Sequence, residues 1–271
     1  MILLGYFLAL IAGVFLGLFG GGGSILIVPI LVYLMGINPI SATAYSLFIV
    51  GIASLFGSQQ YIYKKQINIK IGLIFALPSF IGVFTSRKWV LPNIPEILHI
   101  FDILSISKEA FILVFFALVM LLASLSMIFS WKPKSLSASN NYLWIIIDGF
   151  IVGIITGLVG AGGGFLIVPA LLLFTNINIK DAVGTSLLII TIKSLLGFIG
   201  EFSNPIEWDL MLLFSVLSII GVYLGVYISK HINSSTLKIN IWYFCFTYGH
   251  CDFNKRNLNI NLLQILKPYE N

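Results

Sequence analysis

Long apolar runs separated by short polar stretches dominate the pattern of this chain. Seven runs reach about 18 residues or more, the length at which a helix begins to cross the hydrocarbon core of a bilayer. The pattern therefore predicts an all-α polytopic membrane protein with roughly seven to eight long spans and two shorter segments. The runs cover residues 2–20, 41–58, 69–86, 110–131, 143–160, 182–200 and 210–229.

The composition also indicates that lipid is the solvent. The chain is 59% hydrophobic and 9% charged, whereas about 25% of the residues are charged in ordinary soluble domains. A water-soluble domain of 271 residues has no core large enough to bury so much apolar surface. The opening stretch MILLGYFLALIAG has no lysine or arginine and no clear cleavage site. It therefore predicts a first span and not a cleaved signal peptide.

The net charge of +5 does not indicate a nucleic-acid partner, because the basic residues are scattered over short loops and form no single patch. Cys245 and Cys251 have no CxxC spacing, and we expect neither a metal nor a cofactor. The spans contain no paired carboxylates and no His/Asp cluster, which argues against an enzyme. The expected partners are the bilayer and a small solute.

The chain repeats itself. A shift of 140 positions aligns residues 13–57 with 153–197 without a gap, and 21 of the 45 pairs are identical. The predicted organisation is a first membrane repeat, a cytoplasmic linker, a second membrane repeat and a tail. The tail turns polar after about ten apolar residues, too few for a span, and we expect it to be degenerate or frameshifted. The four parts cover residues 1–130, 131–142, 143–238 and 239–271.

Each repeat contains a cluster of glycines, in GLFGGGGSILIVP at 17–29 and in GLVGAGGGFLIVP at 157–169. Neither stretch has the GxGxxG spacing of a dinucleotide site or the lysine of a P-loop. Each glycine weakens a helix by about 1 kcal/mol relative to alanine, so we predict breaks near 20–24 and 160–164.

The apolar pieces after the breaks, 25–36 and 165–175, are too short to be full spans. Each covers about 18 Å of a core that is about 30 Å thick. They are predicted to be half-helices, with Ser24 as a candidate N-cap of the first and Pro29 loosening it.

A broken helix presents unpaired N–H groups and a positive dipole end, which suit an anion. Matching breaks in duplicated halves indicate the binding site of a transporter. The alternative is that the glycines only permit close helix packing. We favour a site for the two clusters and packing for the outer GxxxG pairs, which are Gly13 with Gly17, Gly153 with Gly157, and Gly221 with Gly225.

Lys193 lies in the apolar stretch TSLLIITIKSLLGF. A lysine at the centre of a spanning helix costs about 2.5 kcal/mol or more, so a compensating role is expected. We favour a counter-charge for an anionic substrate over a lysine that snorkels to the interface or pairs with Glu201. The predicted substrate-binding residues are Gly22, Gly23, Gly162, Gly163, Ser46, Thr185, Ser186 and Lys193; Asp148, Asp181 and Asp209 flank spans and are left unassigned.

The glycine-rich stretches run into an apolar VP segment and are each followed by a helix with Ser or Thr, ATAYSLFIVG at 42–51 and AVGTSLLIIT at 182–191. This arrangement resembles the TauE/SafE sulfite exporter family, also called the toluene-sulfonate uptake permease family, over about residues 1–238. The resemblance implies a multi-pass protein of the cell membrane that moves small anions, often sulfite or organosulfonates, with or without a coupling proton or ion. An anion channel and, less favoured, a membrane-embedded enzyme are the alternatives.

The lysines of the loops indicate how the halves are oriented. Lys64 marks its loop as cytoplasmic, whereas the matching loop 201–209 carries three acids and no base. Five crossings in each half would make the halves inverted repeats with the N-terminus outside, and would place Lys64, Lys132 and Lys230 inside and Asn204 outside. Four crossings would make them parallel and place Asn204 inside, on the same side of the membrane as Lys64. We favour the inverted arrangement.

Overall fold

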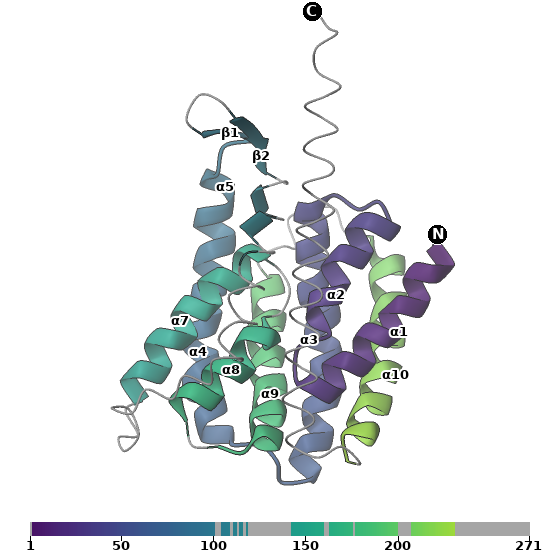
Figure 1. Ribbon diagram of the computed structural model, residues 1–271, viewed down its shortest axis with the longest axis vertical. Coiled ribbons are helices and arrows are strands. Elements are labelled where there is room, and N and C mark those ends of the chain that lie inside the picture. Colours follow the sequence, from purple (N-terminus) through teal and green to yellow (C-terminus); the bar gives the residue numbers. More distant parts are fainter. Residues whose placement is uncertain are drawn as a thin grey trace, which may run out of the picture.

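The computed structural model describes residues 2–100, 104–108, 111–112, 114–115, 118, 142–159, 163–175, 177–199 and 207–230. Helices α3 and α9 run through the middle of the bundle, with α4 and α7 on one side and α1 and α10 on the other (Figure 1). The long helices are α1 (Ile2–Phe19), α3 (Pro39–Tyr63), α4 (Ile69–Thr85), α7 (Tyr142–Val159), α9 (Ile179–Phe198) and α10 (Trp208–Ser229).

Six of the seven predicted runs are therefore helices, and the run 110–131 falls largely outside the described residues. Within the described part of the chain, four helical segments are long and apolar enough to cross a membrane, including α4 with its continuation to Asn93. Helices α1 and α7 contribute shorter apolar segments. The total number of spans stays a prediction.

Asparagine side chains cap the N-terminal ends of helices α3 and α4. The side chain of Asn38 accepts a hydrogen bond of 2.9 Å from the N–H of Ile40, and Pro39 occupies the first helical position. In the same way Asn68 accepts from the N–H of Ile71 at 3.1 Å. Both caps satisfy N–H groups that the start of a helix leaves without a partner.

The first predicted break lies at the end of α1. Gly20 and Gly21 have φ of +65° and +137°, which disfavour residues with a Cβ, so the helix stops at Phe19. Helix α2 (Ser24–Pro29) follows, and directly after Pro29 the winding changes to a π-helical segment, η1 (Ile30–Leu34). A proline removes one backbone donor, which accounts for the change in winding there.

The second break is similar. Gly163 has φ of +66° and precedes α8 (Gly164–Phe174), a helix of 11 residues. The predicted half-helices are thus present.

The predicted N-cap at Ser24 is wrong: the cap position of α2 is Gly23, and the Ser24 hydroxyl donates to the carbonyl of Gly21. Ser24 is already the first helical residue, so its hydroxyl turns back to this carbonyl.

One element departs from the all-α prediction. Helix α4 continues through η2 (Ser86–Val90) and α5 (Leu91–Asn93) into a small antiparallel hairpin of β1 (Ile97–Ile100) and β2 (Leu104–Ser107). The hairpin lies beyond the end of the helical bundle (Figure 1). A search for apolar runs of span length cannot detect strands of four residues.

The outer GxxxG pairs are packing residues, as predicted. Helix α1 packs along α10, and a Cβ added at Gly13 or Gly221 would collide with the backbone of the facing helix. Helix α4 packs along α7 in the same way, where Gly153 faces the backbone of Ser79 and Gly157 faces Val83. Glycine allows these backbones to approach closely inside a membrane.

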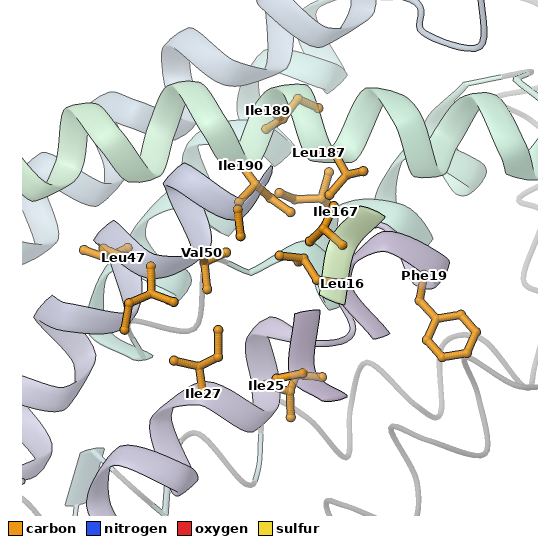
Figure 2. Close-up of a cluster of buried hydrophobic side chains, with 14 of the residues drawn as sticks. Leu16, Phe19, Ile25, Ile27, Leu47, Val50, Ile167, Leu187, Ile189 and Ile190 are labelled. Atoms are coloured by element: carbon orange, nitrogen blue, oxygen red, sulfur yellow. The ribbon is translucent and has the colours of Figure 1, made fainter. Parts of the chain in front are cut away.

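The central helices α3 and α9 pack antiparallel. The rings of Phe48 and Phe198 lie 5.1 Å apart, whereas Gly57, further along α3, faces Leu187, nearer the start of α9. The hydrophobic core fills the space between these helices and the two breaks. Figure 2 shows side chains from five helices in this core: Leu16 of α1, Ile25 and Ile27 of α2, Leu47 and Val50 of α3, Ile167 of α8, and Leu187, Ile189 and Ile190 of α9.

The two ends of the bundle carry different residues. The Lys64 ammonium donates to the carbonyl of Val226 at 3.1 Å, and partial burial with the charges of Lys230 and Lys180 lowers the pKa of Lys64. These three lysines therefore lie at one end. At the start of α3, the N–H of Glu207 donates to the Tyr45 hydroxyl at 3.0 Å, so Glu207 lies toward the other end. Lys132 and Asn204 lie outside the described residues.

Candidate functional site

The two glycine breaks meet inside the bundle. Gly21 and Gly164 approach so closely that neither position has room for a Cβ. The Ser186 hydroxyl lies within hydrogen-bond distance of the carbonyls of Gly20 and Val183, the latter at 2.7 Å. The first break is thereby tied both to the second break and to α9. This contact brings together the segments for which the sequence predicts a binding site.

The first break also contains several backbone donors. The N–H groups of Ser24 and Leu26 donate to the carbonyls of Gly21 and Gly23, each at 3.1 Å. The N–H groups of Gly21, Gly22 and Gly23 have no backbone acceptor among the described residues. Such donors at the start of a helix are suited to an anion.

The predicted glycines differ in how much room surrounds them. A Cβ at Gly22 would meet the side chain of Phe19, at 3.2 Å or more, whereas a Cβ at Gly23 would collide with the backbone of α1 at Ala12 and Leu16. Gly23 therefore also serves close packing. Gly162 lies outside the described residues.

Lys193 lies beside the second break. Its side chain is fully buried, and Nζ donates to Oγ1 of Thr156 on α7 at 2.8 Å. A Cβ added at Gly163 would come within 2.8 Å of Nζ. Full burial contradicts the alternative that Lys193 snorkels to an interface. The alternative partner, Glu201, lies outside the described residues.

The predicted hydroxyl residues do not all face the breaks. Ser186 does, as described above. Ser46 donates to the carbonyl of Thr43 in its own helix at 2.8 Å, as Ser186 does to the carbonyl of Val183. Thr185 accepts from the N–H of Asn68 at 3.0 Å and so faces the loop before α4. One residue along a helix turns a side chain by about 100°, which separates Thr185 from Ser186.

The sequence analysis did not identify Arg87 as a candidate site residue. This residue lies in η2, and only 6% of its surface is exposed. Its neighbour Ser86 packs against Gly157 of α7, one position after Thr156. The pair Arg87 and Lys88 stands at the end of an apolar run, where basic residues are typical of a membrane interface. Nothing in the sequence distinguishes the buried member of this pair from the exposed one.

Comparisons with known proteins find related sequences over most of the chain. The family model described as Sulfite exporter TauE/SafE matches residues 5–249. The probable membrane transporter protein YunE of Bacillus subtilis (strain 168) is 30% identical over 261 residues, covering 85% of this chain and 89% of that protein. The probable membrane transporter protein YjnA of the same organism is 29% identical over 248 residues, covering 85% and 91%.

A third relative comes from another organism. The probable membrane transporter protein MJ0441 of Methanocaldococcus jannaschii is 25% identical over 245 residues, covering 84% of this chain and 86% of that protein. No solved structure gives a significant match. The family match extends over nearly the whole chain, and the curated relatives match at nearly full length. The chain therefore belongs to the sulfite exporter TauE/SafE family.

Proposed function

We propose that this protein is a secondary transporter that moves small oxyanions, such as sulfite or organosulfonates, across the cell membrane. The observation that carries this proposal is the Lys193 ammonium, fully buried beside a glycine break. An intramembrane charge is expensive and is expected to face a substrate or a counter-ion. The family membership and the names of the relatives support transport as the activity.

In this proposal the anion binds where the two breaks meet. An ammonium has three donors, and Lys193 uses one of them on Thr156, which leaves two for a substrate oxygen. The N–H groups near Gly22 add neutral donors, whereas the Ser186 hydroxyl donates to backbone carbonyls and helps to hold the first break in place. Charge-assisted hydrogen bonds of this kind share the charge of an oxyanion over several donors.

We also propose that the two halves are inverted repeats. The shift of 140 residues matches α3 with α9, and these two helices pack antiparallel. A pair of equivalent helices that run in opposite directions is expected when the halves are inverted in the membrane. The position of Lys64 and Lys230 at one end of the bundle supports the same arrangement. Inverted repeats place the binding site at their interface.

Flux measurements in proteoliposomes test the proposal and its alternatives. The panel is sulfite, organosulfonates, thiosulfate and carboxylates, each offered with and without a proton gradient. Saturable uptake, accelerated by unlabelled anion on the opposite side, is the expected result. Anion flux without saturation or exchange would indicate a channel instead. Absence of flux for every anion of the panel would contradict the proposal.

A further inference from the structure

Helices α3 and α10 pack side by side in the same direction, and each ends at a lysine. The rings of Phe56 and Tyr223 lie 6.3 Å apart, and further along both helices the Lys64 ammonium donates to the carbonyl of Val226 at 3.1 Å. Lys64 and Lys230 are the C-cap residues of α3 and α10. We call this line of contact, from Phe56 and Tyr223 to the two lysines, the α3/α10 seam.

The end of the seam brings like charges together. Val226 precedes Lys230 by four residues, about one helical turn, so the ammonium bound to its carbonyl lies near the end of α10. Partial burial and the charges of Lys230 and Lys180 lower the pKa of Lys64, which agrees with this proximity. No carboxylate of the described residues forms an ion pair with Lys64 or Lys230. The two ammoniums therefore repel each other unless an anion binds between them.

A buried amide next to Lys64 lacks a partner. The Nε2 atom of Gln60 is enclosed and has no hydrogen-bond partner in the described part of the chain. Gln60 lies four residues before Lys64 and four after Phe56, so it shares the side of α3 that borders the seam. A buried donor without an acceptor costs free energy. A phosphate group held at Lys64 offers the acceptor that this amide lacks, and its charge compensates both lysines.

The residues beside these donors are apolar rings that face outward. Tyr223 and Tyr227 of α10 are exposed, and so is Tyr63, the neighbour of Lys64. Tyrosine rings are typical of the level at which the head groups of a bilayer meet the acyl chains. The donors at the end of the seam therefore lie beside surface that is suited to lipid rather than to water.

The preference of cytoplasmic loops for lysine does not by itself explain Lys64. A lysine that only marks topology extends into water, as the exposed Lys65 does, whereas Lys64 is partly buried and bonded to a backbone carbonyl. The shift of 140 pairs Gln60 with Gly200 and Lys64 with Asn204, so the second repeat has no cation at this position. The donors are thus not part of the pattern that the two repeats share.

We infer that the end of the α3/α10 seam binds the phosphate head group of an anionic phospholipid. Lys64 and Lys230 supply the charged donors and Gln60 a neutral one, while Phe56 and Tyr223 border the acyl chains. Basic residues between spanning helices are suited to such head groups. The bound lipid links the ends of α3 and α10. The inference goes beyond the proposed transport activity and does not depend on it.

The native protein provides the first test. Purified full-length protein in detergent is heated with phosphatidylglycerol, phosphatidylcholine or glycerol 3-phosphate, and bound lipids are counted by native mass spectrometry. A ligand that binds the folded state raises the unfolding temperature. We expect phosphatidylglycerol to raise it and to remain bound, and the zwitterionic lipid and the soluble phosphate to leave it near that of the untreated protein. Equal stabilisation by the two lipids would overturn the inference.

Substitution provides the second test, with Lys65→Gln as the matched control. Binding is measured at about 0.3 M salt, which screens exposed charges. Lys64→Gln is expected to weaken phosphatidylglycerol binding by about fivefold or more, the contribution of one lysine at an anionic lipid surface. Lys65→Gln is expected to stay within about twofold of the parent, since exposed charges contribute little.

Gln60→Leu separates lipid binding from a structural role. Without lipid this variant is expected to be at least as stable as the parent, because it removes a buried donor that has no partner. It is nevertheless expected to bind phosphatidylglycerol more weakly. Lower stability without lipid together with unchanged lipid binding would contradict the role of Gln60.

The remaining outcomes decide the occupant. Phosphatidylglycerol binding by Lys64→Gln within twofold of the parent would overturn the inference, whether or not the protein transports anions. Stabilisation by glycerol 3-phosphate that Lys64→Gln abolishes would replace the lipid by a soluble phosphate and overturn it as well. If Lys64→Gln cannot be purified in folded form, Lys230→Gln takes its place, with the same weakening expected.

Discussion

Thr156 holds the Lys193 ammonium in place through a hydrogen bond of 2.8 Å. Thr156→Val keeps the shape of the side chain but removes the acceptor, so a buried donor loses its partner. We expect the free energy of unfolding to fall by about 1 to 3 kcal/mol, measured by denaturation in detergent. Thr191→Val is the control, because the Thr191 hydroxyl bonds to the Leu187 carbonyl in its own helix. Equal losses in the two variants would contradict this role of Thr156.

At the residue scale the sequence predicts only part of the candidate site. Lys193 is detectable because a single charge interrupts an apolar stretch on both sides. Arg87 is not, because its burial depends on which side of α4 faces α7. The hydroxyl residues show the same limit: Ser186 faces the break and Thr185 faces a loop, although they are neighbours. Side-chain direction is decided by packing, which residue type and spacing do not reveal.

At the scale of elements, the second break depends on Gly163. Its φ of +66° disfavours any residue with a Cβ, and an added Cβ would collide with Thr156. Gly163→Ala is expected to lower the free energy of unfolding by more than the conformational cost of about 1 to 2 kcal/mol. Gly36→Ala is the control, because Gly36 has φ of +72° but no neighbour within 4 Å of the added Cβ. Equal losses of unfolding free energy in the two variants would contradict a steric role of Gly163.

The interlocked helices α1 and α10 allow a second test at this scale. Gly221→Ala places a methyl group against the backbone of α1 at Val14 and Gly13, so the helices must separate. We expect a loss of about 1 to 3 kcal/mol in unfolding free energy, as in other overpacked cores. Gly5→Ala, on α1, meets only the flexible side chain of Met35 and is expected to change little. Retention of full stability by Gly221→Ala would contradict close packing of α1 and α10.

Elements that have a strong compositional pattern could be predicted from the sequence, and elements without such a pattern could not. The apolar runs gave six helices, and the glycine clusters gave both breaks. The paired strands β1 and β2 and the π-helical segments η1 and η2 were not predicted. The strands have four residues each and the π-helical segments have five, which is too short to leave a periodic pattern in the sequence.

At the scale of the whole molecule, the inverted arrangement predicts which loops share a side. Helix α3 has 25 residues and is about 37 Å long, so Lys64 after its end and Glu207 near its start lie on opposite sides. Single cysteines at 64, 207 and 230, in a protein without Cys245 and Cys251, are treated with an impermeant reagent in whole cells. We expect labelling at 207 and none at 64 or 230. Labelling of 207 and 230 from the same side would contradict the arrangement.

The most direct test of the central claim is the transport rate of Lys193→Gln in proteoliposomes. The parent protein and the variant Lys180→Gln, which removes a lysine from the end of the bundle, are reconstituted at equal density and supplied with labelled sulfite or thiosulfate. If the buried ammonium binds the anion, Lys193→Gln loses about 10-fold or more of the uptake while Lys180→Gln keeps it. Uptake by Lys193→Gln with the affinity and rate of the parent would contradict the claim.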